Sequence, residues 1–286
     1  MNRSRTWWLL AAAQCLLLAL CPIPAFTQDV SGLTFDVTIT TGDSATATVQ
    51  SGSGWIAGKS SRLDLRGPGN AAQTMPGMPG QSMSIIVRDS SGAPVIAMVD
   101  HDAKKVMYPS KMMAMLQEMM ASLPEKPKVG FSVTNIVVDT LGAGETISGF
   151  ATKRFRLSAD LSVSMEMMGE SMDQRIHVVS EGDYAEELAG YVDPLQTTRS
   201  LEAMTSGMPG MDSSAVAELG KLAAARPRGL PLRQSDRMTG ASEGGMPMPP
   251  TVTALSNIRR AEFSPTVFSL PDGYTEMEMP QIPGLN

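Results

Sequence analysis

The chain has 286 residues and is poor in cysteine, aromatic residues and basic charge. Its two cysteines, Cys15 and Cys21, lie in an N-terminal segment that we expect to be removed, so the mature chain has no thiol. Disulfides, cysteine-containing zinc sites and cysteine nucleophiles are thereby excluded. Without that segment, 21 basic residues remain against 29 acidic ones, a net charge of −8. This charge argues against a nucleic-acid partner, because phosphate binding needs a basic surface.

Sequence motifs of catalysis are also missing. The chain has no Gly-x-Ser-x-Gly elbow, no His-Glu-x-x-His motif and no Walker loop. Of the two histidines, His101 lies between Asp100 and Asp102, a pattern typical of a hydrated turn, and His177 alternates within an expected strand. The sequence therefore predicts a non-enzymatic protein without a cofactor or a metal site.

The first 25 residues have the pattern of a signal peptide. Arg3 and Arg5 precede an apolar run over residues 7–20, which is too short for a typical membrane anchor. Cleavage is expected after residue 25, or as late as residue 27. The mature chain contains no other apolar stretch long enough to span a bilayer. The sequence thus predicts a periplasmic or secreted protein.

A lipid anchor at Cys21 is the alternative to simple secretion. A lipobox needs a small residue immediately before the cysteine, and here that residue is Leu20. The following Pro22 is also unfavourable. We therefore expect a cleaved protein that carries no lipid.

Strict alternation of apolar and polar residues dominates the mature chain and predicts strands. Residues 33–40 alternate without a fault, and the closely spaced strands up to residue 99 must be antiparallel, because a parallel crossover needs a dozen or more residues. Residues 155–167 alternate over thirteen positions, a length typical of a twisted, curved sheet. Further strands are expected over residues 131–138 and 263–270. We expect a single α+β domain over residues 28–286.

A helix is expected over residues 110–123. At about 100° per residue, its large apolar side chains fall within an arc of about 160°. Ser110 fits the N-cap position and Pro124 ends the helix. A second helix is expected over residues 215–225. The apolar face of the first helix consists mostly of methionine.

Methionine is abundant, with 23 residues in the chain. Several lie in Gly- and Pro-rich segments, 67–81, 205–213 and 239–250, which we expect to be surface loops. Thioether sulfur favours Cu(I), yet Met165 and Met167 would also share one face of a strand as ordinary core residues. Core packing, an adaptable lining for a hydrophobic ligand, and Cu(I) handling all stay open. An envelope protein acting through protein contacts is a further alternative.

A series of short segments resembles secreted bacterial proteins of the lipoprotein-carrier (LolA-like) fold, in particular an uncharacterised domain family within it. These segments are residues 59–64, a hairpin ending at Tyr108, and residues 147–155, 229–233 and 268–274. The resemblance implies a strongly curved antiparallel sheet, an incomplete barrel, with helices over its concave apolar side. It also implies that a hydrophobic small molecule or a lipid acyl chain binds there.

The two strongest apolar faces, one helical and one on a strand, give the candidate lining of that site. We expect the helix over residues 110–123 to lie against the strand over residues 155–167. The candidate lining residues are Met112, Met115, Leu116, Met119, Leu123, Phe155, Leu157, Leu161 and Val163.

Overall fold

The structure is a computed structural model that describes residues 29–42, 47–67, 82–90, 93–121, 128–167, 170–193, 213–241 and 249–277. The expected signal peptide, its cleavage region and Cys21 lie outside these residues. Most residues of the three methionine-containing segments also lie outside the described part. The first three residues of the third segment are the end of a strand, β10 (Leu230–Ala241).

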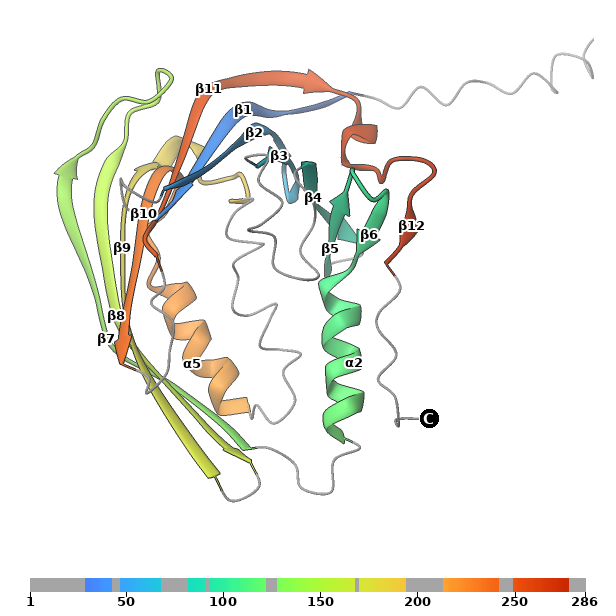
Figure 1. The fold of residues 1–286 in the computed structure, drawn as a ribbon. Coiled ribbons are helices and arrows are strands. Elements are labelled where there is room, and N and C mark those ends of the chain that lie inside the picture. Colours follow the sequence, from blue (N-terminus) through green and yellow to red (C-terminus); the bar gives the residue numbers. More distant parts are fainter. Residues whose placement is uncertain are drawn as a thin grey trace, which may run out of the picture.

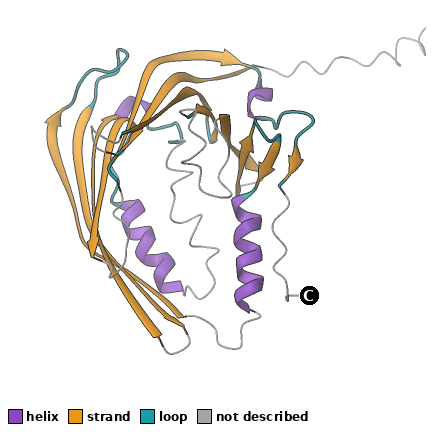
Figure 2. Ribbon diagram, in the orientation of Figure 1, coloured by secondary structure: helices purple, strands orange, loops and turns teal. Residues whose placement is uncertain are grey.

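Strands make up most of the described chain (Figures 1 and 2). They are β1 (Val30–Thr41), β2 (Thr48–Ala57), β3 (Ser60–Arg66), β4 (Ser82–Ser90), β5 (Ala93–Asp100), β6 (Lys105–Met107), β7 (Lys128–Ala143), β8 (Lys153–Met167), β9 (Glu170–Ala185), β10 (Leu230–Ala241), β11 (Thr251–Phe263) and β12 (Thr275–Glu276). The helices of the described part are α2 (Pro109–Ala121) and α5 (Ser213–Ala224), with short 3-10 helices η2 (Glu186–Leu188) and η3 (Pro265–Phe268).

All twelve strands form one sheet in the order β12-β6-β5-β4-β3-β2-β1-β11-β10-β9-β8-β7. Neighbouring strands are antiparallel except β12 and β6, which run parallel. The sheet is strongly curved and does not close, so it has a concave face, a convex face and two edges (Figure 1). The predicted antiparallel pairing of the strands up to residue 99 and the predicted curved sheet are confirmed.

The concave face is apolar because strands place alternate side chains on opposite sides. In β1, Leu33, Phe35, Val37 and Ile39 are all at most 8% exposed. They form the main core together with Ile56, Leu63, Leu188, Leu230, Leu232, Leu255 and other buried residues. The alternation read in the sequence thus produces one continuous buried layer across the middle of the sheet.

Helices occupy two separate places on the concave side (Figure 2). The predicted helix over residues 110–123 is found as α2, which follows β6 after a single residue and contacts β5. The helix α5 lies over the other end of the sheet, against β7 (Figure 1). The helices are a small part of the described chain, and the sheet dominates the fold.

The expected strand over residues 263–270 is wrong beyond Phe263. Residues Pro265–Phe268 form the 3-10 helix η3, whose first turn is capped by Ser264, and the proline at its start favours a helical φ. The segment after η3 returns to the sheet, where Tyr274 Oη lies 2.8 Å from His101 Nδ1 and His101 Nε2 lies 2.6 Å from the fully buried Ser84 Oγ. His101 is therefore in a turn, as expected, but it also holds the C-terminal segment in place.

Close packing of β2 on β3 generates a stability prediction. A Cβ atom on Gly52 would lie 1.8 Å from the backbone oxygen of Asp64. We expect Gly52→Ala to lower the free energy of unfolding by about 1–3 kcal/mol, because the two strands must separate to admit the methyl group. Gly190→Ala, where no atom lies within 4 Å of the added Cβ, is the matched control. Equal urea midpoints for the two variants would contradict this prediction.

Candidate functional site

The strand half of the predicted lining lies on the concave face. Leu157 and Leu161 are 7% and 6% exposed, and both belong to a cluster with Phe131 and Val133 of β7 and Leu222 of α5. On the same face of β8, Phe155 and Val163 are half-buried. The ring of Phe155 makes an edge-to-face contact with that of Tyr184, with 5.8 Å between the ring centroids. The apolar face of this strand that the sequence predicts is therefore present, and a helix covers it.

The covering helix is α5, whereas the prediction assigned α2 to this position. Met112 of α2 is 37% exposed, Met115 is half-buried, and the buried methionine of the described part is Met113. The side chains of Leu116 and Met119, and the whole of Leu123, lie outside the described part. The single residue between β6 and α2 keeps the helix beside β5, and seven strands separate β5 from β8. The contacts of α2 with β5 thus do not bring the helical part of the predicted lining to its strand part on β8.

The apolar part of the concave face extends beyond α5. Val178 and Ile176 of β9 are half-buried beside the cluster under α5. On the same face, Met238 pairs with Val178 and is 40% exposed, and Met172 pairs with Met165 and is 62% exposed. Methionine and branched side chains therefore face the open concave side where no described helix covers them.

A polar group interrupts this apolar face. Asp236 of β10 pairs with Ser180 of β9, which in turn pairs with Leu157. Its Oδ1 accepts hydrogen bonds from Ser180 Oγ and from Gln234 Nε2, each 2.8 Å long. The polar group lies between the main core and the cluster under α5, so the concave face contains an acceptor flanked by two apolar regions.

Tyr184 is buried, and this burial shifts the pKa of its hydroxyl. Burial, with smaller contributions from the charges of Asp193 and Asp236 and an opposing one from Arg226, raises the pKa of the Tyr184 hydroxyl to about 12. Burial dominates because the ionised phenolate would lose its hydration. Tyr184 therefore stays neutral in the folded protein well above pH 10.

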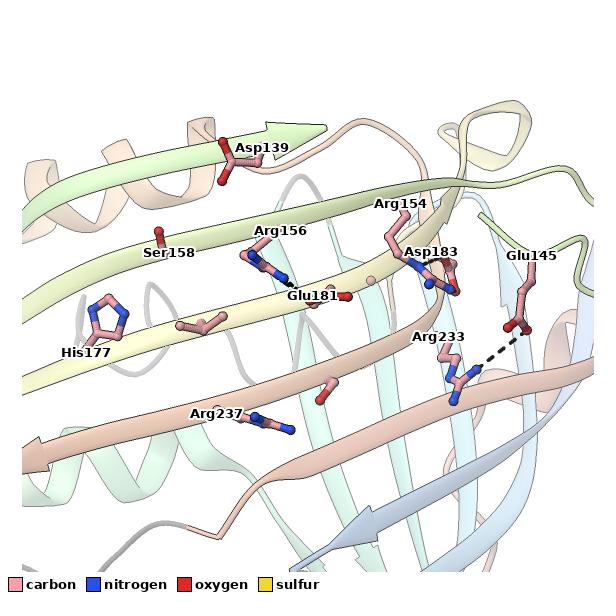
Figure 3. Close-up of a pocket in the computed structure, with 13 residues that line it drawn as sticks. Asp139, Glu145, Arg154, Arg156, Ser158, His177, Glu181, Asp183, Arg233 and Arg237 are labelled. Carbon is pink, nitrogen blue, oxygen red and sulfur yellow. Dashed lines mark hydrogen bonds and ion pairs between the residues drawn. The ribbon is translucent and has the colours of Figure 1, made fainter. Parts of the chain in front are cut away.

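The convex face carries a charged groove of about 870 Å³ over β8, β9 and β10 (Figure 3). Its side chains alternate with those of the apolar cluster, so the same strands build both features. The charged lining residues are Arg154, Arg156, Arg233, Arg237, Asp139, Glu145, Glu181 and Asp183, with His177 at one end. Four arginines are thus balanced by four carboxylates.

Cross-strand ion pairs order this groove. Arg154 Nε and Nη2 donate to the two carboxylate oxygens of Asp183 at 2.8 and 2.9 Å, and Asp183 is only 2% exposed. Its hydrogen bond and charge raise the pKa of Arg154. Arg156 and Glu181 pair at 3.0 Å and are both exposed. Such pairs hold neighbouring strands in register, and they leave no strong net charge to attract an ion of either sign.

Other ionisable groups of the described chain form pairs. Asp160 accepts hydrogen bonds from Asn135 Nδ2 at 2.7 Å and lies 2.6 Å from His177 Nδ1, and these two contacts lower the pKa of its carboxyl. In the part of the chain that the structure describes, no three His, Cys, Asp or Glu side chains gather closely enough to hold a metal ion. None of the described helices has the length and apolar character needed to cross a membrane.

Arg154 and Arg156 form ion pairs that differ in the burial of the carboxylate, so substitutions of the two arginines can be compared. Arg154→Met leaves the buried carboxylate of Asp183 without its cation, and we expect this to lower the urea midpoint of unfolding. Arg156→Met breaks only an exposed pair and should leave the urea midpoint nearly unchanged. Equal effects of the two substitutions would show that Asp183 does not depend on Arg154.

Tyr184 generates a pH prediction. Because its folded-state pKa lies above the unfolded value of 10, its stabilising effect is complete below pH 10 and is lost as the pH rises from 10 to about 12. This loss amounts to roughly 2–3 kcal/mol. Tyr184→Phe should remove that part of the alkaline decline in urea midpoint, whereas Tyr191→Phe controls for the loss of a hydroxyl. An unchanged alkaline decline in Tyr184→Phe would contradict the assignment.

Comparison with known proteins gives likenesses of structure. No protein-family model matches the sequence, and no curated protein matches it. The fold is similar to a domain from Vibrio parahaemolyticus assigned to outer membrane lipoprotein sorting, with 7% identity, 84% of this chain and 89% of that chain covered, and a TM-score of 0.28. It is also similar to a DUF1329 family protein from Desulfovibrio piger ATCC 29098, with 8% identity, 91% and 93% covered, and a TM-score of 0.26. Both likenesses concern the fold alone, and at these TM-scores neither carries an argument about family, ligand or function.

Proposed function

We propose that this protein is a non-enzymatic carrier that binds a hydrophobic ligand, such as a lipid acyl chain, on the concave face of its sheet. The observation that carries the proposal is the apolar surface beside α5 that no described helix covers. Met172 and Met238 are exposed there on the same face as the buried Leu157 and Leu161. An apolar surface that faces the inside of an open curved sheet is suited to an elongated apolar ligand.

The residue types of this surface support a ligand of variable shape. Methionine has an unbranched, flexible and polarisable side chain that adapts to irregular apolar partners. Val178 and Ile176 provide a more rigid floor next to it. Each methylene group that an acyl chain buries there contributes about 0.8 kcal/mol, so a chain of ordinary length gains enough to offset the cost of association.

The proposed cellular location follows from the N-terminal segment. A cleaved signal peptide over residues 1–25 would deliver the protein to the periplasm or the medium, without a lipid at Cys21. In that aqueous compartment an acyl chain needs a protein that shields it from water. The acidic mature chain is compatible with this location.

Charge placed on the concave surface tests the proposal. Met172→Glu and Met238→Glu should each weaken the binding of a fluorescent fatty acid by roughly tenfold or more, because a carboxylate would then lie against the chain. Both side chains are exposed, so the urea midpoint should stay close to that of the parent. Binding is measured by titration of the probe.

Val49→Glu is the matched control, because Val49 is 49% exposed but pairs with Thr40 on the convex face. It should bind the probe like the parent. Native mass spectrometry of protein isolated from its own periplasm should in addition find a bound acyl compound. A protein that holds no acyl compound and takes up no probe, or equal binding by all three variants, would refute the carrier function.

A further inference from the structure

The strand β7 (Lys128–Ala143) lies at an edge of the sheet, and its only neighbour among the described strands is β8 (Figure 1). An edge strand has one row of backbone N–H and C=O groups without a strand partner. Such a row is a template for another chain unless the protein covers it or interrupts it. β7 has sixteen residues, which makes this a long edge.

The first half of β7 is covered by α5. Phe131 and Val133 are buried against that helix in the cluster that contains Leu222. The backbone N–H of Val133 donates to Glu218 Oε2 of α5 at 3.3 Å, so a side chain occupies a position where another strand would pair. The contact with Lys221, followed by this backbone hydrogen bond, lowers the pKa of Glu218 and keeps it ionised as an acceptor.

The second half of β7 is open. A bulge between Thr134 and Val137 separates it from the covered half, and a further bulge follows Thr140. All residues from 137 to 143 are exposed. Val137, Val138 and Leu141 are 48%, 39% and 41% exposed, so three large apolar side chains face solvent within five residues of one strand. Exposed edges usually carry lysine or proline instead.

A single negative charge lies in this open stretch. Asp139 pairs in register with Arg156 of β8, but Arg156 makes its ion pair with Glu181 at 3.0 Å. No ion pair of Asp139 is found within the described residues. A second copy of the chain paired about this position would place two aspartates opposite each other, and like charges across a strand pair are unfavourable. The charge therefore favours a different partner, with a basic residue opposite Asp139.

We propose that residues 137–141 of β7 accept an extended segment of a partner protein as an additional antiparallel strand. In this arrangement the partner places a lysine or arginine opposite Asp139 and apolar residues opposite Val137 and Val138. Main-chain hydrogen bonds supply the attraction, and the side chains on the two faces supply the selectivity. The covered first half of β7 confines the added strand to the open half. This docking surface is independent of the proposed acyl-binding face.

A synthetic peptide of sequence Thr-Val-Thr-Lys-Val-Val-Thr, acetylated and amidated at its ends, tests the proposal with the full mature chain. We expect it to protect the amides of residues 137–143 from hydrogen exchange. It should bind about fivefold more tightly, or better, than the same peptide with glutamate in place of lysine, because unlike charges attract across a strand pair. A peptide that is N-methylated at alternate residues should bind less well, because it cannot form the ladder of hydrogen bonds.

Charge reversal in the protein completes the test. Asp139→Lys should invert the preference between the two peptides, Asp139→Asn should abolish it, and Asp272→Lys, an exposed change in a distant turn, should leave it unchanged. Equal binding of both peptides to the parent protein, no protection of residues 137–143, or equal binding of the N-methylated peptide would each overturn the proposal. So would a concentration-dependent dimer that Val138→Asp dissociates, because a second copy would then be the occupant.

Discussion

The pairing of β1 with β11 holds the two halves of the molecule together. Strands β1 to β6 form a meander in chain order, and β7 to β10 form a second antiparallel group, so neither half contacts the other through consecutive strands. The pairing from Val30 opposite Phe263 to Thr41 opposite Thr251 joins them in the middle of the sheet. It also places Val37 beside Leu255 in the main core. Without this long-range pairing, each half would expose a strand edge, and the main core, which contains residues of both halves, would be divided.

The sheet gives the two sides of β8, β9 and β10 different properties. On the concave side, Leu157 and Leu161 are buried under α5, and the exposed Met238 and Met172 extend that apolar surface. On the convex side, arginine and carboxylate pairs such as Arg154 and Asp183 link the same strands. One alternating pattern therefore produces both a surface suited to a hydrophobic ligand and a charged groove that holds the strands in register. Because the sheet does not close, β7 remains as an edge that α5 covers only in part.

Local patterns predicted individual elements well. The alternation over residues 155–167 corresponds to β8 (Lys153–Met167), and the methionine-rich helix corresponds to α2 (Pro109–Ala121). The strand expected over residues 131–138 is longer than predicted, because two bulges allow β7 to continue where its alternation breaks. Beyond Phe263, Pro265 and the Ser264 cap replaced the expected strand by a 3-10 helix. The role of His101 depends on Tyr274, which is 173 positions away in the chain, and no local pattern could indicate it.

The sequence by itself determined the curved antiparallel sheet and the apolar face of each strand and helix, because these depend on periodicity over a few neighbouring residues. It also identified Leu157 and Leu161 as buried residues of the concave side. Only the tertiary structure decided which helix covers that face, since α2 and α5 both have an apolar side and would fit it equally well on pattern alone. The single residue between β6 and α2 keeps that helix next to β5, while seven strands separate β5 from β8 in the sheet. The pairing of β1 with β11 sets that distance, and it depends on contacts between residues more than 200 positions apart.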